Sequence, residues 1–239
     1  AEAVIHTWGF NSYFLLLMGY GSLGFLAALQ VREPPRKTTS SAMDGFFSTA
    51  LKDGHLTVML IAMMFGAGFS AMTNFLPLYA QTLGLRAGVF FVSYGVSLIL
   101  VRVLLGQVAD NVNREKLILA CLVGFGVMLL STSQINSIVQ TAFLGVLFGL
   151  AQGMSYPAMM ACMVDRSTDA NSCVVVALFT GSFGVGINVS VPLWGLIAKF
   201  QGLSFMFLAG GLVMLLGAVM FSLGSFVPRG NLQRAASRH

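Results

Sequence analysis

The chain has 239 residues, of which 56% are hydrophobic and only 9% are charged, and its mean hydropathy is +0.84. A soluble domain is about 25% charged, so this composition argues against a soluble enzyme or binding module and predicts an all-α, polytopic membrane protein. The net charge of +5 comes from short clusters between apolar runs and not from one basic patch, which argues against a nucleic-acid-binding protein.

Seven apolar runs are long enough to cross about 30 Å of hydrocarbon as helices. In chain order, we expect membrane spans at residues 11–29, 56–81, 88–108, 117–133, 138–163, 173–198 and 203–226. The long connection after the first span contains Pro34, Pro35 and a Thr/Ser cluster, a composition typical of a loop. We therefore expect an outer segment with the first span (1–29), a cytoplasmic central loop (30–55), a six-helix unit (56–227) and a cytoplasmic tail (228–239). The absence of an initial Met suggests a piece of a longer protein.

Basic residues are distributed unequally between the connections on the two sides of the membrane. Ten of the 13 Lys and Arg fall in the first, third and fifth connections and in the tail, whereas the opposite side has only Arg86 and Lys199. Because Lys and Arg are retained on the cytoplasmic side, this bias predicts an outward-facing N-terminus and a cytoplasmic C-terminus.

Polar side chains are concentrated in the second, fifth and sixth predicted spans. The first, fourth and seventh spans are almost purely apolar, so we expect them to face lipid, and their recurrence at every third helix is typical of repeated three-helix units. In the second span, Ser70, Asn74, Pro77 and Gln81 are spaced by four, three and four residues, which places them on one helical face. Such polar stripes face either an aqueous cavity or a neighbouring helix.

Small residues indicate where helices approach closely. Gly145, Gly149 and Gly153 recur every four residues, so one face of the fifth span has no side chains. No CxxC pair occurs among Cys121, Cys162 and Cys173, and we expect these cysteines to act as small buried residues. The sequence has no cluster of His with acidic residues and no nucleophile beside a base. We therefore expect no enzymatic activity, metal site or cofactor.

The charged stretch GQVADNVNREK, residues 106–116, lies between the third and fourth spans. It resembles the loop motif of the major facilitator superfamily of transporters, which begins with Gly and has Asp four residues later, followed by bases. Gly106, Asp110, Arg114 and Lys116 match that motif, and Arg102 precedes it by four residues as is common in the family. The sequence departs from the motif where Asn111 and Glu115 replace bases and Asn113 replaces a glycine.

Three further stretches extend the resemblance. FLPLYAQTLGL (75–85), GLAQGMSYPAMMACMVDR (149–166) and GSFGVGINVSVPLWG (181–195) are similar to the seventh, tenth and eleventh helices of bacterial efflux-type members. The first span and the central loop are similar to the sixth helix and the loop after it. One departure is at Asn171 and Ser172, where the family often has an Arg-Gly pair. The chain thus resembles helices six to twelve of a twelve-helix transporter.

The resemblance implies secondary active efflux of a small drug, sugar or metallophore-like solute across the bacterial inner membrane by alternating access. It implies two sets of site residues: substrate-facing Asn74, Phe75, Tyr79, Gln152, Tyr156 and Asn188, and gating Arg102, Gly106, Asp110, Arg114, Lys116 and Arg166. The implied partners are the lipid bilayer, a small-molecule substrate and a missing N-terminal half. No Asp, Glu or His occurs in the span cores, so we expect a proton-coupling carboxylate to lie in the other half.

The alternative is a seven-helix membrane receptor, since seven spans with an outward N-terminus share that topology. A retinal protein would need a Lys in the last helix, and none occurs between Phe200 and Arg234. The sequence alone does not indicate the substrate, the direction of transport or the coupling ion.

Overall fold

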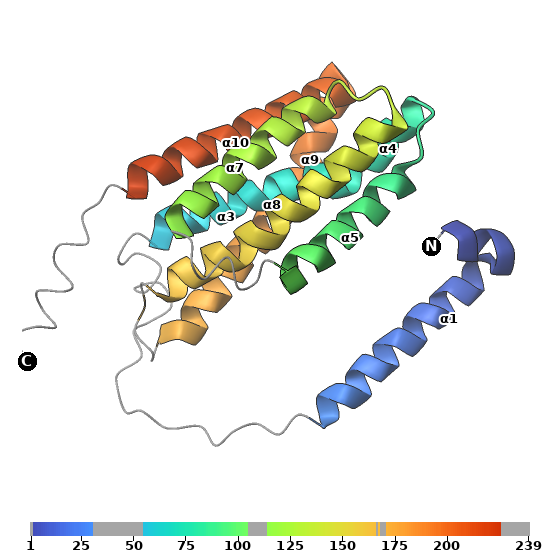
Figure 1. The fold of residues 1–239 in the computed structure, drawn as a ribbon, viewed down its shortest axis with the longest axis horizontal. Helices are drawn as coiled ribbons and strands as arrows, with labels where there is room; N and C mark the ends of the chain where they lie inside the picture. The colour runs from blue at the N-terminus through green and yellow to red at the C-terminus, as the bar shows by residue number, and fades with distance from the viewer. Residues whose placement is uncertain (1, 31–54, 105–113, 166, 168–170, 226–239) are drawn as a thin grey trace, which may run out of the picture. The chain divides into compact units, whose positions relative to one another are not determined.

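The computed structural model describes residues 2–30, 55–104, 114–165, 167 and 171–225. These residues are helical apart from short turns (Figure 1), which confirms the all-α prediction. The elements are α1 (Glu2–Leu29), α3 (His55–Ser70), the π-helix η1 (Ala71–Phe75), α4 (Leu76–Thr82), α5 (Ala87–Leu104), α7 (Arg114–Thr132), α8 (Ile138–Val164), α9 (Ser172–Gln201) and α10 (Leu203–Ser225).

The described helices confirm six predicted spans as long and apolar enough to cross a membrane. α3, η1 and α4 together form one of them, His55–Thr82, and α5, α7, α8, α9 and α10 supply the others. The first predicted span lies within α1, whose described apolar stretch, Phe14–Leu29, is shorter than the six spans. The chain divides into two compact units, with α1 in Ala1–Ser41 and the other helices in Ala42–His239.

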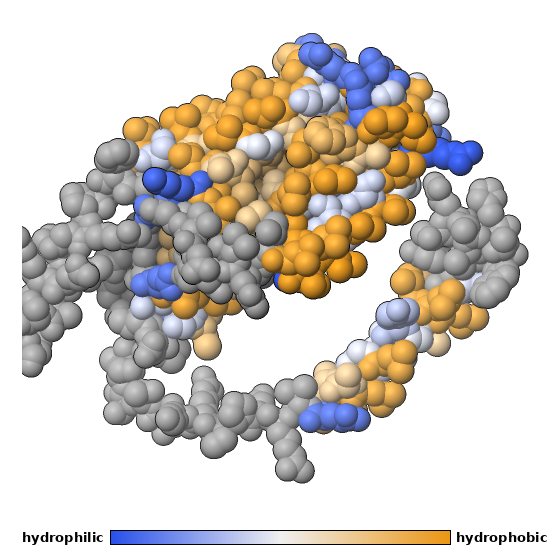
Figure 2. Space-filling model, in the orientation of Figure 1, coloured by the Kyte–Doolittle hydropathy of each residue, from blue (hydrophilic) through white to orange (hydrophobic). Residues whose placement is uncertain are grey.

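The second unit is a bundle built from three main helix pairs. α5 packs against α8, α3 against α9, and α7 against α10, while α8 also contacts α7 and α10 also contacts α3. Phe65, Phe125 and Phe148 are fully buried where these pairs meet. Figure 2 shows that the visible outer face of the bundle is mostly apolar, with hydrophilic residues gathered at the end where α4 ends and α8 begins. This distribution is typical of helices surrounded by lipid.

The glycine repeat in α8 brings that helix close to α5, as predicted. A Cβ atom added at Gly145 would lie 2.5 Å from the Phe90 carbonyl oxygen, and one added at Gly149 would lie 2.7 Å from the Tyr94 carbonyl oxygen. Real Cβ atoms do not approach so closely, so only glycine permits this separation. Close approach of backbones is how membrane helices gain van der Waals contact without a hydrophobic driving force.

The second predicted span contains a π-helix that its sequence pattern did not predict. Pro77 has no N–H to donate to the carbonyl of Thr73, and η1 ends two residues before it. The wider π turn changes the register of the residues on either side. Ser70, which precedes the π turn, is fully buried, whereas Asn74 and Gln81 are exposed, so the four residues do not share one polar face.

The helices differ in how much of each span the bundle covers. The apolar helix α7 buries Ile118, Leu122 and Leu129 against its neighbours. The least covered span is α5, in which only 17% of the span is buried, compared with 44% for α7. The apolar helix α7 thus packs against its neighbours on one side, and the expectation that apolar helices face lipid on the other side stays a prediction.

Candidate functional site

Two of the predicted site residues, Gln152 and Tyr156, lie one turn apart on α8, and both are half-buried. The Tyr94 hydroxyl on α5 donates a hydrogen bond of 2.6 Å to the Gln152 Oε1 atom. This contact is possible because Gly149 lets the backbones of α5 and α8 approach. Sequence reasoning missed Tyr94. The available signal was its position as a tyrosine within the otherwise apolar run before Arg102.

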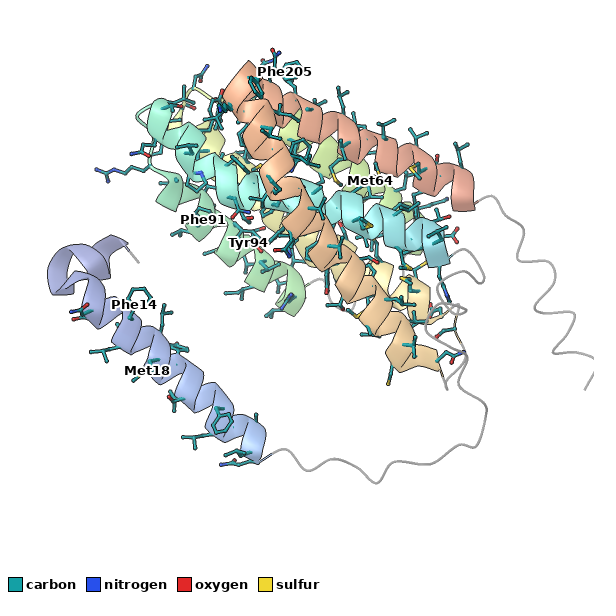
Figure 3. The ribbon with its side chains drawn as sticks, turned by 180° about the vertical axis from the view of Figure 1, so that it is seen from behind. Phe14, Met18, Met64, Phe91, Tyr94 and Phe205 are labelled. Carbon is teal, nitrogen blue, oxygen red and sulfur yellow. The ribbon has the colours of Figure 1, made fainter. Side chains whose placement is uncertain are left out.

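Aromatic rings pack against Tyr94 and Tyr156, which flank Gln152. The Tyr94 ring lies 4.8 Å from the Phe148 ring, and the Tyr156 ring lies edge-on to Phe179 and Phe183, each at 5.2 Å. Figure 3 shows Tyr94 on α5 within the bundle. Ring contacts continue through Phe183 and Phe69 to α3. We call this set the aromatic cluster; its members are Phe69, Phe90, Tyr94, Phe148, Tyr156, Phe179 and Phe183.

The other two predicted amides lie on different helices and are exposed. The Asn74 Nδ2 atom, in η1, donates to the Ser70 carbonyl oxygen at 3.1 Å, and the Asn188 Nδ2 atom, on α9, donates to the Gly184 carbonyl oxygen at 2.8 Å. Phe75, beside Asn74, is half-buried against the hydrophobic core. The structure thus does not join the predicted residues into one hydrogen-bonded group, since each amide bonds to a residue outside the set.

Tyr79 occupies a different environment from the other predicted substrate-facing residues. Its side chain is only 8% exposed, its hydroxyl donates to the Ser133 carbonyl oxygen at 2.8 Å, and its ring lies 5.4 Å from Phe207. The same carbonyl accepts a hydrogen bond from Ser204. Tyr79 therefore connects α4 to the turn after α7 and to α10, which is a packing role.

The break in the second span is held by contacts from α9. The Trp194 Nε1 atom donates to the Ala67 carbonyl oxygen at 2.9 Å, and the hydroxyls of Ser70 and Ser190 are 2.6 Å apart. Both serines and Trp194 are buried. These hydrogen bonds satisfy polar groups at the end of α3 where the regular helical pattern changes.

Half of the predicted gating residues fall within the described part of the chain. Arg102 is exposed in the last turn of α5, Arg114 begins α7, and Lys116 is exposed in the first turn of α7. Gly106, Asp110 and Arg166 lie outside the described residues, as do most of the central loop and the tail. The predicted gating role of the loop therefore stays a prediction.

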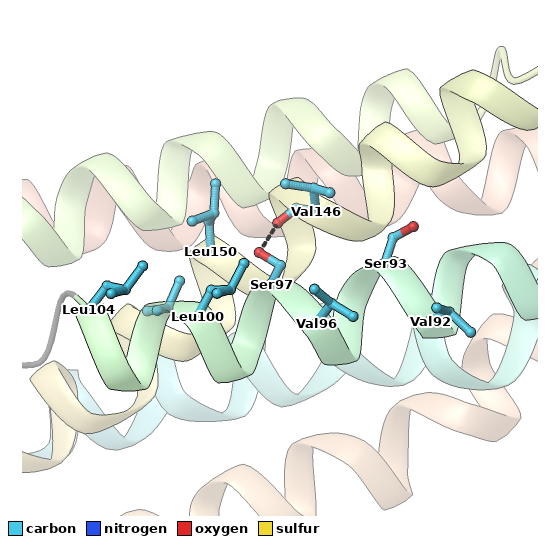
Figure 4. Close-up of a pocket in the computed structure, with 9 residues that line it drawn as sticks. Val92, Ser93, Val96, Ser97, Leu100, Leu104, Val146 and Leu150 are labelled. Atoms are coloured by element: carbon cyan, nitrogen blue, oxygen red, sulfur yellow. Dashed lines mark hydrogen bonds between the residues drawn. The ribbon is translucent and has the colours of Figure 1, made fainter.

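One groove occurs on the α5 and α8 pair, with a volume of about 510 Å³. Figure 4 shows Ser97 at its floor, where the hydroxyl donates to the Val146 carbonyl oxygen at 2.9 Å. The remaining lining is apolar except for Ser93, and it includes neither Tyr94 nor Gln152. This groove suits an apolar group and offers no means of recognising a polar solute.

The described residues contain no group of three His, Cys, Asp or Glu side chains that could hold a metal ion. Of the three cysteines, Cys162 is buried and Cys121 is half-buried, but Cys173 is exposed near the start of α9. The prediction that all three are small buried residues is thus wrong for Cys173.

The six apolar helices found among the described residues, packed through glycines and in part with polar side chains in their middle portions, define a multi-pass membrane protein. The sequence matches the Major Facilitator Superfamily over residues 1–115 and again over 87–239. The chain therefore belongs to this superfamily of transporters, and the receptor alternative is dropped.

Two curated relatives are similar to parts of the chain. The Staphylopine export protein of Staphylococcus aureus (strain Mu50 / ATCC 700699) is 25% identical over 169 residues, which are 67% of this chain and 42% of that protein. The Putative metabolite transport protein YaaU of Escherichia coli (strain K12) is 27% identical over 139 residues, or 56% of this chain and 28% of that protein. The aligned region spans less than half the length of either relative.

Proposed function

We propose that this chain is the C-terminal part of an alternating-access transporter that moves a small solute out of the bacterial cytoplasm across the inner membrane. Its first 29 residues and central loop would precede a six-helix half, and a second half would complete the pathway. Membership in the superfamily and the names of the two relatives support transport. Export is favoured by the resemblance to efflux-type members.

The main support from the geometry is the presence of exposed amides on helices that cross the membrane. Asn188 lies near the middle of its span and Asn74 lies in the second half of its span, and both are exposed in the bundle. An amide facing hydrocarbon would lose hydrogen bonds to water at a cost of a few kcal/mol, roughly 1–3 by mutational estimates. These side chains therefore favour a water-filled cavity on one side of the bundle.

We assign five of the six predicted residues to the wall of that cavity: Asn74, Phe75, Gln152, Tyr156 and Asn188. Amides supply both donors and acceptors to a polar solute, and the half-buried Phe75 and Tyr156 rings supply apolar surface. Tyr79 is left out because its hydroxyl and ring are already engaged with Ser133 and Phe207. The cavity would exist only between this half and its partner.

The cavity can be tested by cysteine labelling in the complete transporter. In a background with Cys121, Cys162 and Cys173 replaced by serine, a cysteine at Asn74, Gln152 or Asn188 should react rapidly with a small water-soluble thiol reagent. Leu216 is the matched control, because it is 59% exposed in the bundle but lies on the apolar helix α10, where we expect lipid. Leu122, which is fully buried, is the second control. Equal labelling at the amide and Leu216 positions would contradict the proposed cavity.

A further inference from the structure

A group of polar side chains on α5 and α8 is not fully used by the proposed solute pathway. The hydroxyl of Tyr94 donates to the Gln152 Oε1 atom, so the amide oxygen of Gln152 is already occupied. Among the described residues, the Gln152 side chain makes no other hydrogen bond. Its Nε2 group is therefore available as a donor. Tyr94 thus fixes the orientation of the Gln152 amide.

A positive charge lies on the same face of α5. Tyr94, Leu98 and Arg102 follow each other at intervals of four residues, so they occupy one stripe of the helix. Helical side chains lean toward the N-terminal end of the helix, which directs the Arg102 guanidinium back toward Tyr94. On α8, a Cβ atom added at Gly153, next to Gln152, would lie 3.1 Å from side-chain atoms of Leu98 and of Val101, the neighbour of Arg102.

Arg102 is the only charged residue of the span Ala87–Leu104, and it is exposed. Because Arg102 lies in the last turn of α5, its side chain reaches the end of the span, where a guanidinium can meet water or an anion. No ion pair of Arg102 with another described residue is formed. Within the described part of the bundle, the guanidinium thus has no acidic partner.

Aromatic surface lies beside these donors. Tyr94 and Tyr156 are both half-buried, and their inner edges rest on Phe148 and Phe183. Supported rings of this kind offer a fixed apolar wall with little conformational freedom to lose on binding. The apolar groove that includes Ser97 and Leu100 lacks such donors.

We propose that Arg102 and Gln152 form an anion subsite that binds the carboxylate of a small organic acid, whose apolar body lies against the Tyr94 and Tyr156 rings. A guanidinium presents a planar pair of N–H groups that matches a carboxylate. The Gln152 amide adds one more donor, and Tyr94 is a positioning residue because its proton is committed to Gln152. This inference rests on the proposed transport function and specifies its substrate class.

The test compares three ligands that share one ring and differ in the charge of the attached group. Radiolabelled benzoate, benzamide and benzylamine are anionic, neutral and cationic respectively, and equilibrium binding is measured on the complete transporter in phosphatidylcholine nanodiscs. We expect benzoate to bind about tenfold more tightly than benzamide, a difference typical of one charge-assisted contact. Arg102→Gln should abolish this preference, and Arg102→Lys should keep part of it.

Two further variants separate binding from general effects of charge and folding. Arg86→Gln removes an exposed charge from the turn before α5, outside the site, and should keep the benzoate preference. Tyr94→Phe should reduce the affinity for benzoate several-fold while leaving the affinity for benzylamine unchanged. The comparison of ligands on the unmodified protein needs no variant, so it decides the question even if Arg102→Gln fails to fold.

Equal binding of benzoate and benzamide, or no binding of benzoate, would overturn the subsite, and it would mean that Arg102 only contacts lipid phosphates or water. Flux of the three compounds into proteoliposomes then separates the two proposals. Flux of benzamide or benzylamine without benzoate preference would leave the transport function standing and remove the subsite. Arg102-dependent binding of benzoate without flux of any compound would support the subsite and contradict transport.

Discussion

At the scale of single residues, the hydroxyl and amide groups of this bundle differ in whether they are bonded internally. The Tyr79 hydroxyl is buried and donates to the Ser133 carbonyl oxygen, whereas the Tyr156 hydroxyl makes no hydrogen bond with the described residues. Both tyrosines were expected to face substrate. The internal bond separates a residue that maintains the fold from one that is free to contact a solute.

Replacing Tyr79 with Phe should destabilise the protein, because the Ser133 carbonyl oxygen then has one donor fewer. The expected loss is about 1 kcal/mol, which corresponds to a fall in Tm of roughly 2–4 °C for a chain of this size. Thermal unfolding in detergent, followed by circular dichroism, measures it. Tyr156→Phe is the matched control and should leave the Tm unchanged. Equal effects of the two substitutions would show that the Tyr79 hydrogen bond does not contribute to stability.

At the scale of helices, glycine positions determine which pairs pack closely. Gly145 and Gly149 face the α5 backbone, and Gly186 faces the Met63 backbone on α3. Gly181, although it belongs to the same glycine-rich stretch as Gly186, has open space around it. A glycine therefore contributes to packing only on the face that meets a neighbour.

Gly149→Ala should separate α5 from α8, because the new methyl group would lie 2.7 Å from both the Tyr94 carbonyl oxygen and the Ser97 Cβ atom. Such overpacking costs about 1–3 kcal/mol, and the shift should also weaken the Tyr94 to Gln152 hydrogen bond. Gly181→Ala, in open space on α9, should be neutral or stabilising, since alanine favours helix by up to about 1 kcal/mol over glycine. Urea unfolding in mild detergent measures both. A Gly149→Ala variant as stable as Gly181→Ala would contradict the close approach of α5 and α8.

At the scale of the whole molecule, the bundle has an unevenly covered surface. α5 is the least buried span, and α9 exposes Asn188 together with the open glycines Gly181 and Gly184. Polar and small residues on exposed faces of membrane helices are typical of contacts with other helices or with a cavity. These faces are consistent with contact to a second half. The aligned part of the chain covers 42% of the length of one curated relative and 28% of the length of the other.

The charged loop between α5 and α7 belongs to this scale because its proposed role involves both halves. We expect Asp110 to face a helix N-terminus of the partner half, where a carboxylate gains about 0.3–2 kcal/mol and shifts a two-state equilibrium several-fold. Asp110→Asn in the complete transporter should leave abundance normal, favour the inward-open state and slow transport. The effects are measured by double electron–electron resonance distances across the cytoplasmic gate and by initial rates of flux. If both stay at wild-type values, the loop serves only as a positive-inside anchor.

The order and approximate ends of six of the seven predicted spans could be predicted from local composition alone. A membrane imposes a length of about 20 apolar residues on each helix, so each span is visible in its own stretch of sequence. Predicted span 138–163, for example, is observed as α8, Ile138–Val164. The close face formed by Gly145, Gly149 and Gly153 was also predictable, because a four-residue repeat defines one side of a helix whatever lies beside it.

Which polar groups face each other depended instead on how the helices pack. Packing of α3 against α9 buried Ser70 while Asn74, in η1, stayed exposed, and the approach of α8 to α5 brought Gln152 to Tyr94 across 58 positions of sequence. The physical reason is that lipid and protein interior are similarly apolar, so hydrophobicity does not mark the inner face of a membrane helix. Which face is inner depends on the neighbouring helices, and the sequence of one helix does not specify them.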